Sequence, residues 1–287
     1  MDNSISIASS AMLVELSITG WTARKLDKKV SAEIDVSKGT QTQAGNYHKN
    51  LLAGTGVLDT ITKYAANARA WNISQTLPWS DSGLRLLPVS NFITYKEQLN
   101  KLEENYNALV SKFIDAYPNL VTAAAFQLGN LFDRTEYPDA DKIIHKFKFS
   151  YNFFPVPQSG DFRVDIGEDA KQEIALSCQH AYEDRLNNAM SESWQRLHKC
   201  LSNISERLTL NDDGSPKVFR DSLVDNAHEL IDLLKHLNIT KDPKLEQARQ
   251  ELSNAILHHD ADSLRGNLQA KHAVKHQVDS ILSKFNF

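Results

Sequence analysis

The feature that most constrains this fold is the spacing of apolar residues along two long stretches of the chain. In residues 91–117 apolar side chains recur at alternating intervals of four and three, and the same spacing runs through residues 168–210. The two sets are Tyr95, Leu99, Leu102, Tyr106, Leu109 and Phe113, and then Leu186, Met190, Trp194, Leu197, Leu201, Ile204 and Leu208. Because a helix turns once every 3.6 residues, each set lies on one face as an apolar seam. We therefore predict two long helices and a predominantly α fold.

Three more helical stretches follow, at residues 217–237, 242–258 and 262–285. The run "NDDGSP" at residues 211–216 is typical of a turn between helices. Asp242-Pro243 is a favourable start for the next helix, because proline fits the first helical position. Residues 168–287 are thus predicted to form an antiparallel helical hairpin or bundle.

A small antiparallel β-sheet is predicted from three stretches in which apolar and polar residues alternate. They are residues 14–19, 147–153 and 162–166, and the last two read as strands joined by a loop. The fold class is therefore α+β, predominantly α. We expect two domains, a mixed helical domain with the sheet at 1–167 and the long-helix bundle at 168–287.

The remaining N-terminal stretches favour helices. Residues 21–36 and 46–73 are predicted as helices around a polar loop at 37–45, although Gly54 and Gly56 weaken the second one. Pro118 is expected to end or kink the long helix that precedes it, with further helix up to residue 132. Residues 139–147 form a short amphipathic piece.

The loop at residues 77–92, "LPWSDSGLRLLPVSNF", is unusually apolar. Its Ser-Asp-Ser-Gly centre favours a turn, so the flanking leucines and Trp79 can pack back as an ordered cap. The alternative is a loop that docks a partner through Trp79 and Arg85, because Trp and Arg are enriched at interface hot spots.

Composition limits the function classes. The 287 residues carry a net charge of −4, so bulk attraction to nucleic acid or anionic membranes is not expected. We expect no secretory signal and no membrane span. Cys178 and Cys200 fall about 33 Å apart on one predicted helix, so they cannot pair there. Reduced thiols and a cytoplasmic location fit best.

No combination of residues predicts a catalytic site, a metal site or a bound cofactor. His272 and His276 share a helix face, but no third ligand is evident, and Lys271 and Lys275 lie beside them. Cys178 and Cys200 each have a histidine nearby in sequence, at spacings that point the side chains apart on a helix. A surface charge cluster is the favoured interpretation of Asp161, Arg163 and Asp165, and an acidic metal site is the alternative.

A basic stretch, "WTARKLDKK", is the candidate for nucleic-acid binding. Cations beside an aromatic ring can bind a phosphate backbone and stack a base, and the "HKFKF" run adds two more lysines. The candidate residues are Trp21, Arg24, Lys25, Lys28, Lys29, Lys146 and Lys148. A solvated or partner-facing surface is the favoured interpretation of the same residues.

Several stretches together resemble a family of proteins encoded mainly by bacteriophages. In order they are "LSITGWTARKLDKKV", "AGNYHKNLL", "TLPWSDSGLRLLP", "NLFDRTEYPDADKI" and "FSYNFFPVPQSGDFRVDIG", and they span residues 16–167. Members of this family have no established activity and are often encoded near AAA ATPases of the MoxR or CobS type. The resemblance implies a phage-encoded protein that acts in the cytoplasm of the infected cell.

Three function classes follow. The first is a non-enzymatic interaction or adaptor protein, self-associating through its seams and working with a MoxR-type AAA ATPase that would supply the energy. The second is a nucleic-acid-binding protein of phage replication or recombination that uses the basic stretch. An enzyme of unfamiliar type is a third and less favoured class.

Overall fold

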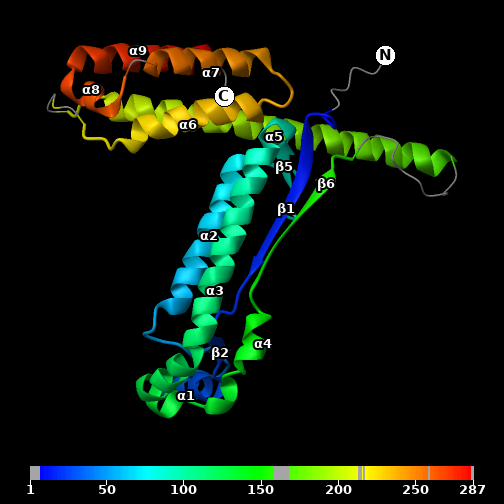
Figure 1. The fold of residues 1–287 in the computed structure, drawn as a ribbon, viewed down its shortest axis with the longest axis vertical. Helices are drawn as coiled ribbons and strands as arrows, with labels where there is room; N and C mark the ends of the chain where they lie inside the picture. Colours follow the sequence, from blue (N-terminus) through cyan, green and yellow to red (C-terminus); the bar gives the residue numbers. More distant parts are fainter. Residues whose placement is uncertain (1–6, 158–167, 213–214, 216, 258, 286–287) are drawn as a thin grey trace. The chain divides into compact units, whose positions relative to one another are not determined.

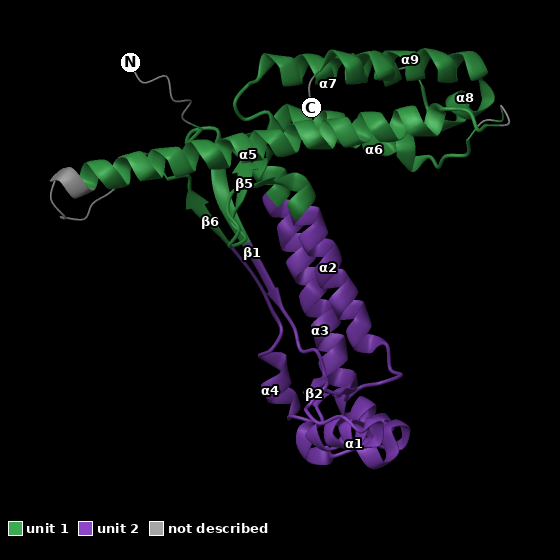
Figure 2. Cartoon of the chain, turned by 180° about the vertical axis from the view of Figure 1, so that it is seen from behind, with its two compact units in different colours: residues 1–15, 73–95, 152–287 green, residues 16–72, 96–151 purple. Residues whose placement is uncertain are grey.

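The structure is a computed structural model that describes residues 7–157, 168–212, 215, 217–257 and 259–285 (Figure 1). Helices make up 66% of it and accompany a small antiparallel sheet, so the α+β, predominantly α class is confirmed. The chain divides into two compact units (Figure 2). Unit 1 comprises residues 1–15, 73–95 and 152–287, and unit 2 comprises 16–72 and 96–151. The division therefore does not follow the predicted boundary between residues 167 and 168.

The strands and helices follow one another in this order along the chain. The strands are β1 (Ala11–Thr19), β2 (Arg24–Leu26), β3 (His48–Asn50), β4 (Leu77–Pro78), β5 (Arg85–Pro88) and β6 (Lys148–Pro155). The helices are α1 (Lys28–Lys38), α2 (Val57–Gln75), α3 (Phe92–Leu128), α4 (Ala140–Ile144), α5 (Glu168–Leu208), α6 (Ser222–Leu237), α7 (Pro243–Ile256), α8 (Ala261–Gly266) and α9 (Leu268–Lys284).

The second half of α5 forms a helical bundle with α6, α7 and α9 in unit 1 (Figure 1). The seam residues from Leu197 to Leu208 face the other three helices and are buried. Asp242 caps α7 by accepting from the amide of Lys244, and its other carboxylate oxygen accepts from Trp194 Nε1 at 3.2 Å. The helix start predicted at Asp242-Pro243 is therefore confirmed.

The apolar loop at residues 77–92 forms a short β-hairpin. β4 pairs with β5, and β5 pairs with β1, in a four-stranded sheet of order β4-β5-β1-β6. Gly83 takes a φ of +96°, which the tight turn between β4 and β5 requires and glycine adopts at little cost. Leu77, Leu86 and Leu87 are completely buried. The strands predicted at residues 14–19 and 147–153 lie in β1 and β6, whereas residues 162–166 lie outside the described residues.

Trp79 fixes this hairpin to the first half of α5. Its ring is 4% exposed and meets the ring of Tyr182 edge-on, with 5.7 Å between centroids. Tyr182 Oη also accepts a hydrogen bond from the amide of Ile7. The ordered-cap interpretation of this loop therefore describes its structure.

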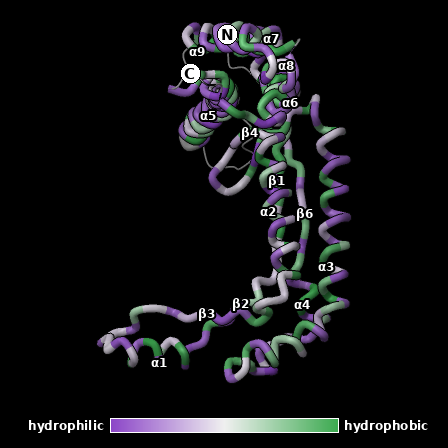
Figure 3. Tube along the Cα trace, turned by 90° about the vertical axis from the view of Figure 1, so that its left-hand side faces the viewer, coloured by the Kyte–Doolittle hydropathy of each residue, from purple (hydrophilic) through white to green (hydrophobic). Residues whose placement is uncertain are grey.

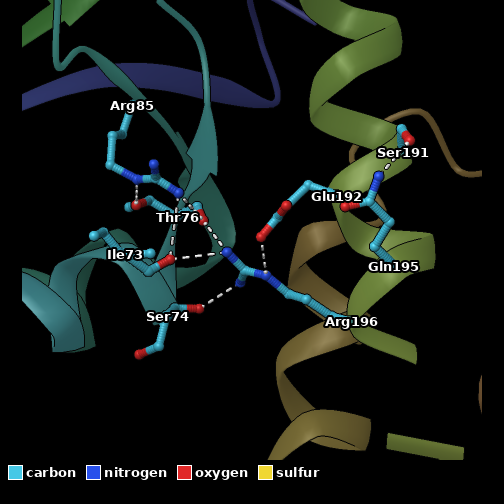
Figure 4. A network of polar contacts seen from close by, with 8 residues as sticks. All are labelled: Ile73, Ser74, Thr76, Arg85, Ser191, Glu192, Gln195 and Arg196. Carbon is cyan, nitrogen blue, oxygen red and sulfur yellow. Dashed lines mark hydrogen bonds and ion pairs between the residues drawn. The ribbon is translucent and has the colours of Figure 1, made fainter. Parts of the chain in front are cut away.

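Two arginines, Arg196 from α5 and Arg85 from β5, donate to the C-terminal end of α2 in unit 1 (Figure 4). Arg196 donates to the carbonyls of Ser74 at 2.7 Å and of Ile73 and Thr76 at 2.9 Å. Arg85 donates from Nε to Thr76 Oγ1 at 2.6 Å and from Nη2 to the Thr76 carbonyl at 3.0 Å. Carbonyls at a helix C-terminus lack intrahelical partners and carry partial negative charge, so cations stabilise them. Burial, and then the charge of Arg196, lowers the pKa of Arg85.

Unit 2 centres on aromatic side chains of α3. The ring of Phe113 lies 6.3 Å from that of Trp21 and 5.5 Å from that of Phe147, and Tyr117 joins the same cluster. Tyr106 donates to the carbonyl of Thr19 at the end of β1. Phe147, just before β6, and Phe149 of β6, whose ring lies 5.7 Å from that of Tyr106, therefore pack on the seam of α3.

Two predicted helices begin later than expected in unit 2. Residues 21–23 are not helical and lead into β2, and α1 starts after Asp27, whose side chain accepts from the amide of Val30. An aspartate caps a helix best from the position just before the first turn, where its side chain accepts from a free amide. Asp27 therefore marks the start of α1, and the helix predicted from residue 21 begins only after it. The stretch predicted from residue 46 begins with β3, and Gly54 and Gly56 have φ values of +78° and +64° before α2 starts.

Other boundaries also differ. α3 continues through Pro118 to Leu128, so the helix does not end at this proline, which was one of the two expectations there. The predicted helix at 262–285 is split, because the Asn267 side chain caps a new helix by accepting from the amides of Gln269 and Ala270. The helix expected from residue 217 begins at Ser222. Over the residues that the structure describes, none of the helices is both long and apolar enough to cross a membrane.

Arg196→Met should destabilise unit 1 by about 2 kcal/mol, because three carbonyls lose a charged donor. Chemical denaturation followed by circular dichroism measures this change. Lys199→Met, at an exposed lysine of the same helix, is the matched control and should stay within about 0.5 kcal/mol of the wild type. Equal stability of the two variants would show that the Arg196 contacts add nothing.

Candidate interaction surface

The helix α1 contributes very little to the core of unit 2. Only Ser31 is buried among its eleven residues, while Ile34 and Val36 are 44% and 81% exposed. We call the segment at residues 21–50, which holds β2, α1 and β3, the α1 lobe (Figure 3). A helix that buries one small polar side chain gains almost nothing from the hydrophobic effect.

Polar contacts hold the α1 lobe together instead. Ser31 Oγ donates to the carbonyl of Asp27 at 2.6 Å and accepts from the amide of Tyr47 at 2.9 Å. β2 pairs antiparallel with β3 from Arg24 opposite Asn50 to Leu26 opposite His48. These bonds fix α1 onto the two strands while its outer faces stay in solvent.

Lys49 is the buried charge that anchors the α1 lobe. Its side chain is 5% exposed, and Nζ lies 2.7 Å from Glu136 Oε2 and 3.3 Å from Asp27 Oδ2. Nζ also donates to the carbonyl of Leu131 at 2.9 Å. Burial alone would lower the pKa of Lys49, but the two carboxylates outweigh burial and raise it. The pKa of Asp27 is lowered, first by its bond from Val30 and then, against burial, by Lys49.

The structure spreads the predicted basic stretch over two elements. Arg24 and Lys25 lie in β2, and Lys28 and Lys29 lie in the first turn of α1, so they do not share one helix. All four are exposed, and none has an ion-pair or hydrogen-bond partner for its side chain among the described residues. Lysines in a first turn oppose the helix dipole, at a cost of about 0.3–1 kcal/mol each. The stability of α1 therefore does not explain why they stand there.

The other three predicted nucleic-acid residues have different surroundings. Trp21 is half-buried in the aromatic cluster of α3, with its ring 5.8 Å from that of Tyr117, so its ring is used in packing. Lys146 and Lys148 are exposed on either side of Phe147. The Phe147 and Trp21 rings both contact Phe113, which brings the two predicted runs to one aromatic cluster.

The predicted partner-binding residues are used inside unit 1. Trp79 is buried against Tyr182, and Arg85 donates to the last turn of α2. Neither offers a free surface in this structure.

A hollow of about 700 Å³ lies between α1 and the loop at 40–46. Lys28, Ala32 and Val36 line it from α1, opposite Thr40 and Gln41. Asp35 Oδ1 accepts from the amide of Ala44 at 3.2 Å, which closes the loop over the helix. The sequence indicated only a polar loop here. Whether that loop encloses a hollow depends on how it packs beside α1, which its composition does not reveal.

The remaining candidates do not converge. Cys178 and Cys200 are both free, and burial raises the pKa of Cys200 to about 11, so its thiol stays protonated at neutral pH. Asp161, Arg163 and Asp165 lie outside the described residues. Within the described part of the chain, no three His, Cys, Asp or Glu side chains are grouped to hold a metal ion.

Comparisons with protein-family models, with curated proteins and with solved structures found no match to this chain.

Lys49→Met should destabilise unit 2 by about 3 kcal/mol, because two partly buried carboxylates lose their counter-charge. Chemical denaturation followed by tryptophan fluorescence measures this change, with Trp21 and Trp71 as the tryptophans of unit 2. Lys38→Met, at an exposed lysine of α1, is the control and should change stability by less than about 0.5 kcal/mol. A Lys49→Met protein as stable as the control would contradict the anchoring role.

The Lys49 contribution should disappear at alkaline pH. Because the pKa of Lys49 is raised by folding, its stabilisation is complete below the unfolded-state pKa of about 10.4 and is lost as the pH rises through the higher folded-state value. We expect the stability difference between wild type and Lys49→Met to be constant near neutral pH and to shrink above about pH 10.5. Urea titrations at a series of pH values measure it, and a difference that persists unchanged at pH 12 would contradict the prediction.

Proposed function

We propose that this protein is a non-enzymatic interaction protein whose α1 lobe binds an acidic surface of a partner protein. The observation that carries the proposal is a set of exposed cations whose side chains have no partner among the residues that the structure describes: Arg24, Lys25, Lys28, Lys29 and Lys38. Some basic side chains elsewhere, such as Lys142, Arg249 and Lys275, are paired with carboxylates three or four residues away, whereas these five lie within residues 24–38 of one lobe.

The architecture of the α1 lobe supports this use. The dipole of α1 places partial positive charge beside Lys28 and Lys29, so their fields add at the same end of the helix. The hollow beside α1 and the exposed side chain of Val36 supply shape and apolar surface next to those charges. Complementary charge speeds association and fixes orientation, while apolar contact supplies affinity.

The identity of the partner rests on the resemblance of residues 16–167 to the phage-encoded family. On that basis the partner is proposed to be a MoxR-type AAA ATPase, and the site of action the cytoplasm of an infected cell. The α1 lobe falls inside the resembling region.

Self-association through the seams receives no support. Tyr106 and Phe113 of the first seam, and Leu197 and Leu201 of the second, are buried inside the chain itself. The seams are used in folding, so the proposed interaction surface is the α1 lobe alone.

Nucleic-acid binding in phage replication or recombination is the second candidate, favoured by the same unpaired cations. Phosphates would take the place of carboxylates, and affinity would fall steeply with salt as counterions are released. The packing of Trp21 against α3 argues against the base stacking that this candidate was expected to use.

The double variant Arg24→Glu with Lys28→Glu tests both candidates. Tagged wild type and variant are used in pull-downs from infected cells, with and without nuclease, and bound proteins are identified by mass spectrometry. We expect the wild type to capture a partner protein whether or not nuclease is added. The amount captured by the variant should be at least tenfold lower, because charge reversal repels an acidic surface.

Lys199→Glu with Arg185→Glu, at two exposed residues of α5, is the matched control and should retain the partner. Partners that disappear with nuclease would favour nucleic-acid binding. Equal capture by the α1-lobe variant and the wild type would rule out the α1 lobe as the binding surface.

A further inference from the structure

A second surface hollow, of about 450 Å³, lies in unit 1 between the end of α5 and the start of α6. Its polar lining consists of Arg207 and Asn203 from α5, Arg220 from the preceding loop, and Ser222 and Asn226 from α6. Every one of these side chains can donate hydrogen bonds, and none of the described residues that line the hollow is acidic.

Within the described part of the chain these donors are not paired. Arg207, Arg220, Asn203, Ser222 and Asn226 make no side-chain hydrogen bond or ion pair to another described residue. The described lining of the hollow therefore combines two full positive charges with three neutral donors and has no acidic side chain. Such a donor set is complementary to an anion with several oxygens.

The loop that carries Arg220 is fixed from below. Arg265 donates to the carbonyl of Phe219 from Nε at 3.3 Å and from Nη2 at 3.1 Å, and it also pairs with Asp221. The guanidinium of Arg265 and the ammonium of Lys271 each lie 5.4 Å from the centre of the Phe219 ring. Phe219 is itself buried, so the backbone on both sides of Arg220 is held in place.

Lys271 adds a buried positive charge beneath this loop. Its side chain is 3% exposed, and no carboxylate pairs with it among the described residues. A buried ammonium without a counter-charge is costly, and a single cation–π contact offsets only part of that cost. An anion bound in the hollow above would supply favourable potential to Lys271 as well as to the two arginines.

We propose that this hollow binds the phosphate group of a small phosphorylated molecule through Arg207 and Arg220. Phosphate presents several oxygens to the forked guanidinium groups, which bind it in bidentate fashion. The group attached to the phosphate would lie against the rest of the lining. This lining is apolar at Val218 and Leu223 and carries the amide side chains of Asn203 and Asn226. A volume of this size matches ordinary small-molecule sites. The first amides of α6 already bond to the carbonyls of Arg220 and Asp221, so the site rests on side chains.

Isothermal titration calorimetry on the full chain at low salt tests the proposal, with inorganic phosphate, AMP and adenosine as the probes. Phosphate and AMP should bind saturably and adenosine should not. A higher affinity for AMP than for phosphate would identify a nucleotide-like ligand. Equal affinities would show that the phosphate group alone is recognised. Either result supports the site. No saturable binding of phosphate or AMP, or adenosine binding as well as AMP, would overturn it.

Arg207→Gln and Arg220→Gln should each weaken phosphate or AMP binding about tenfold, because each removes a charged hydrogen-bond donor. Arg185→Gln, at an exposed arginine near the middle of α5 and away from the hollow in sequence, is the matched control and should bind as wild type. Asn226→Asp is an almost isosteric variant that places a negative charge at the hollow, so it reports even if an arginine variant fails to fold. Unchanged binding in Asn226→Asp and in the folded arginine variants would overturn the assignment.

Discussion

The apolar seam of α5 is the constraint on which unit 1 depends. Its first part packs on the sheet, where Leu186 and Ala189 meet Trp79 and Leu86. Its second part, from Leu197 to Leu208, packs in the helical bundle. Met190 borders both cores, so one helix face orders two sets of partners that are far apart in sequence. Arg196 of α5 adds a polar connection, because it donates to the carbonyl of Ile73 in the last turn of α2.

The α1 lobe follows a different rule. It lacks an apolar core, and its geometry comes from a capping aspartate, a serine that bonds in two directions and one buried lysine between two carboxylates. Polar bonds of this kind fix direction more strictly than apolar packing, but each adds little net stability. The consequence is a small structure that presents exposed cations in a defined arrangement.

Periodicity predicted the long helices and the strands β1 and β6, because buried seams and alternating aromatics leave a regular pattern in the sequence. It failed around Asp27, Gly54 and Asn267, where a single cap or a left-handed glycine overrides the pattern of the neighbouring residues. The basic residues could be named from the sequence, but their separation onto β2 and α1 could not, because it depends on pairing with β3. The hollow at Arg207 and Arg220 left no signal, since its residues come from the end of α5 and from residues 218–226, which only folding brings together.

The division of the chain into interleaved segments has a consequence for folding during synthesis. Unit 2 is complete in sequence by residue 151, whereas unit 1 needs residues 152–287 as well as the much earlier 1–15 and 73–95. A ribosome therefore finishes all of unit 2 before it begins α5. During that interval Leu77, Trp79 and Leu86 have been made but lack the helix that covers them. Exposed apolar surface and unpaired strand edges invite aggregation in such intermediates. Synthesis of this chain thus passes through a stage in which all of unit 2 has been made and the hairpin of unit 1 still lacks the helix that covers it.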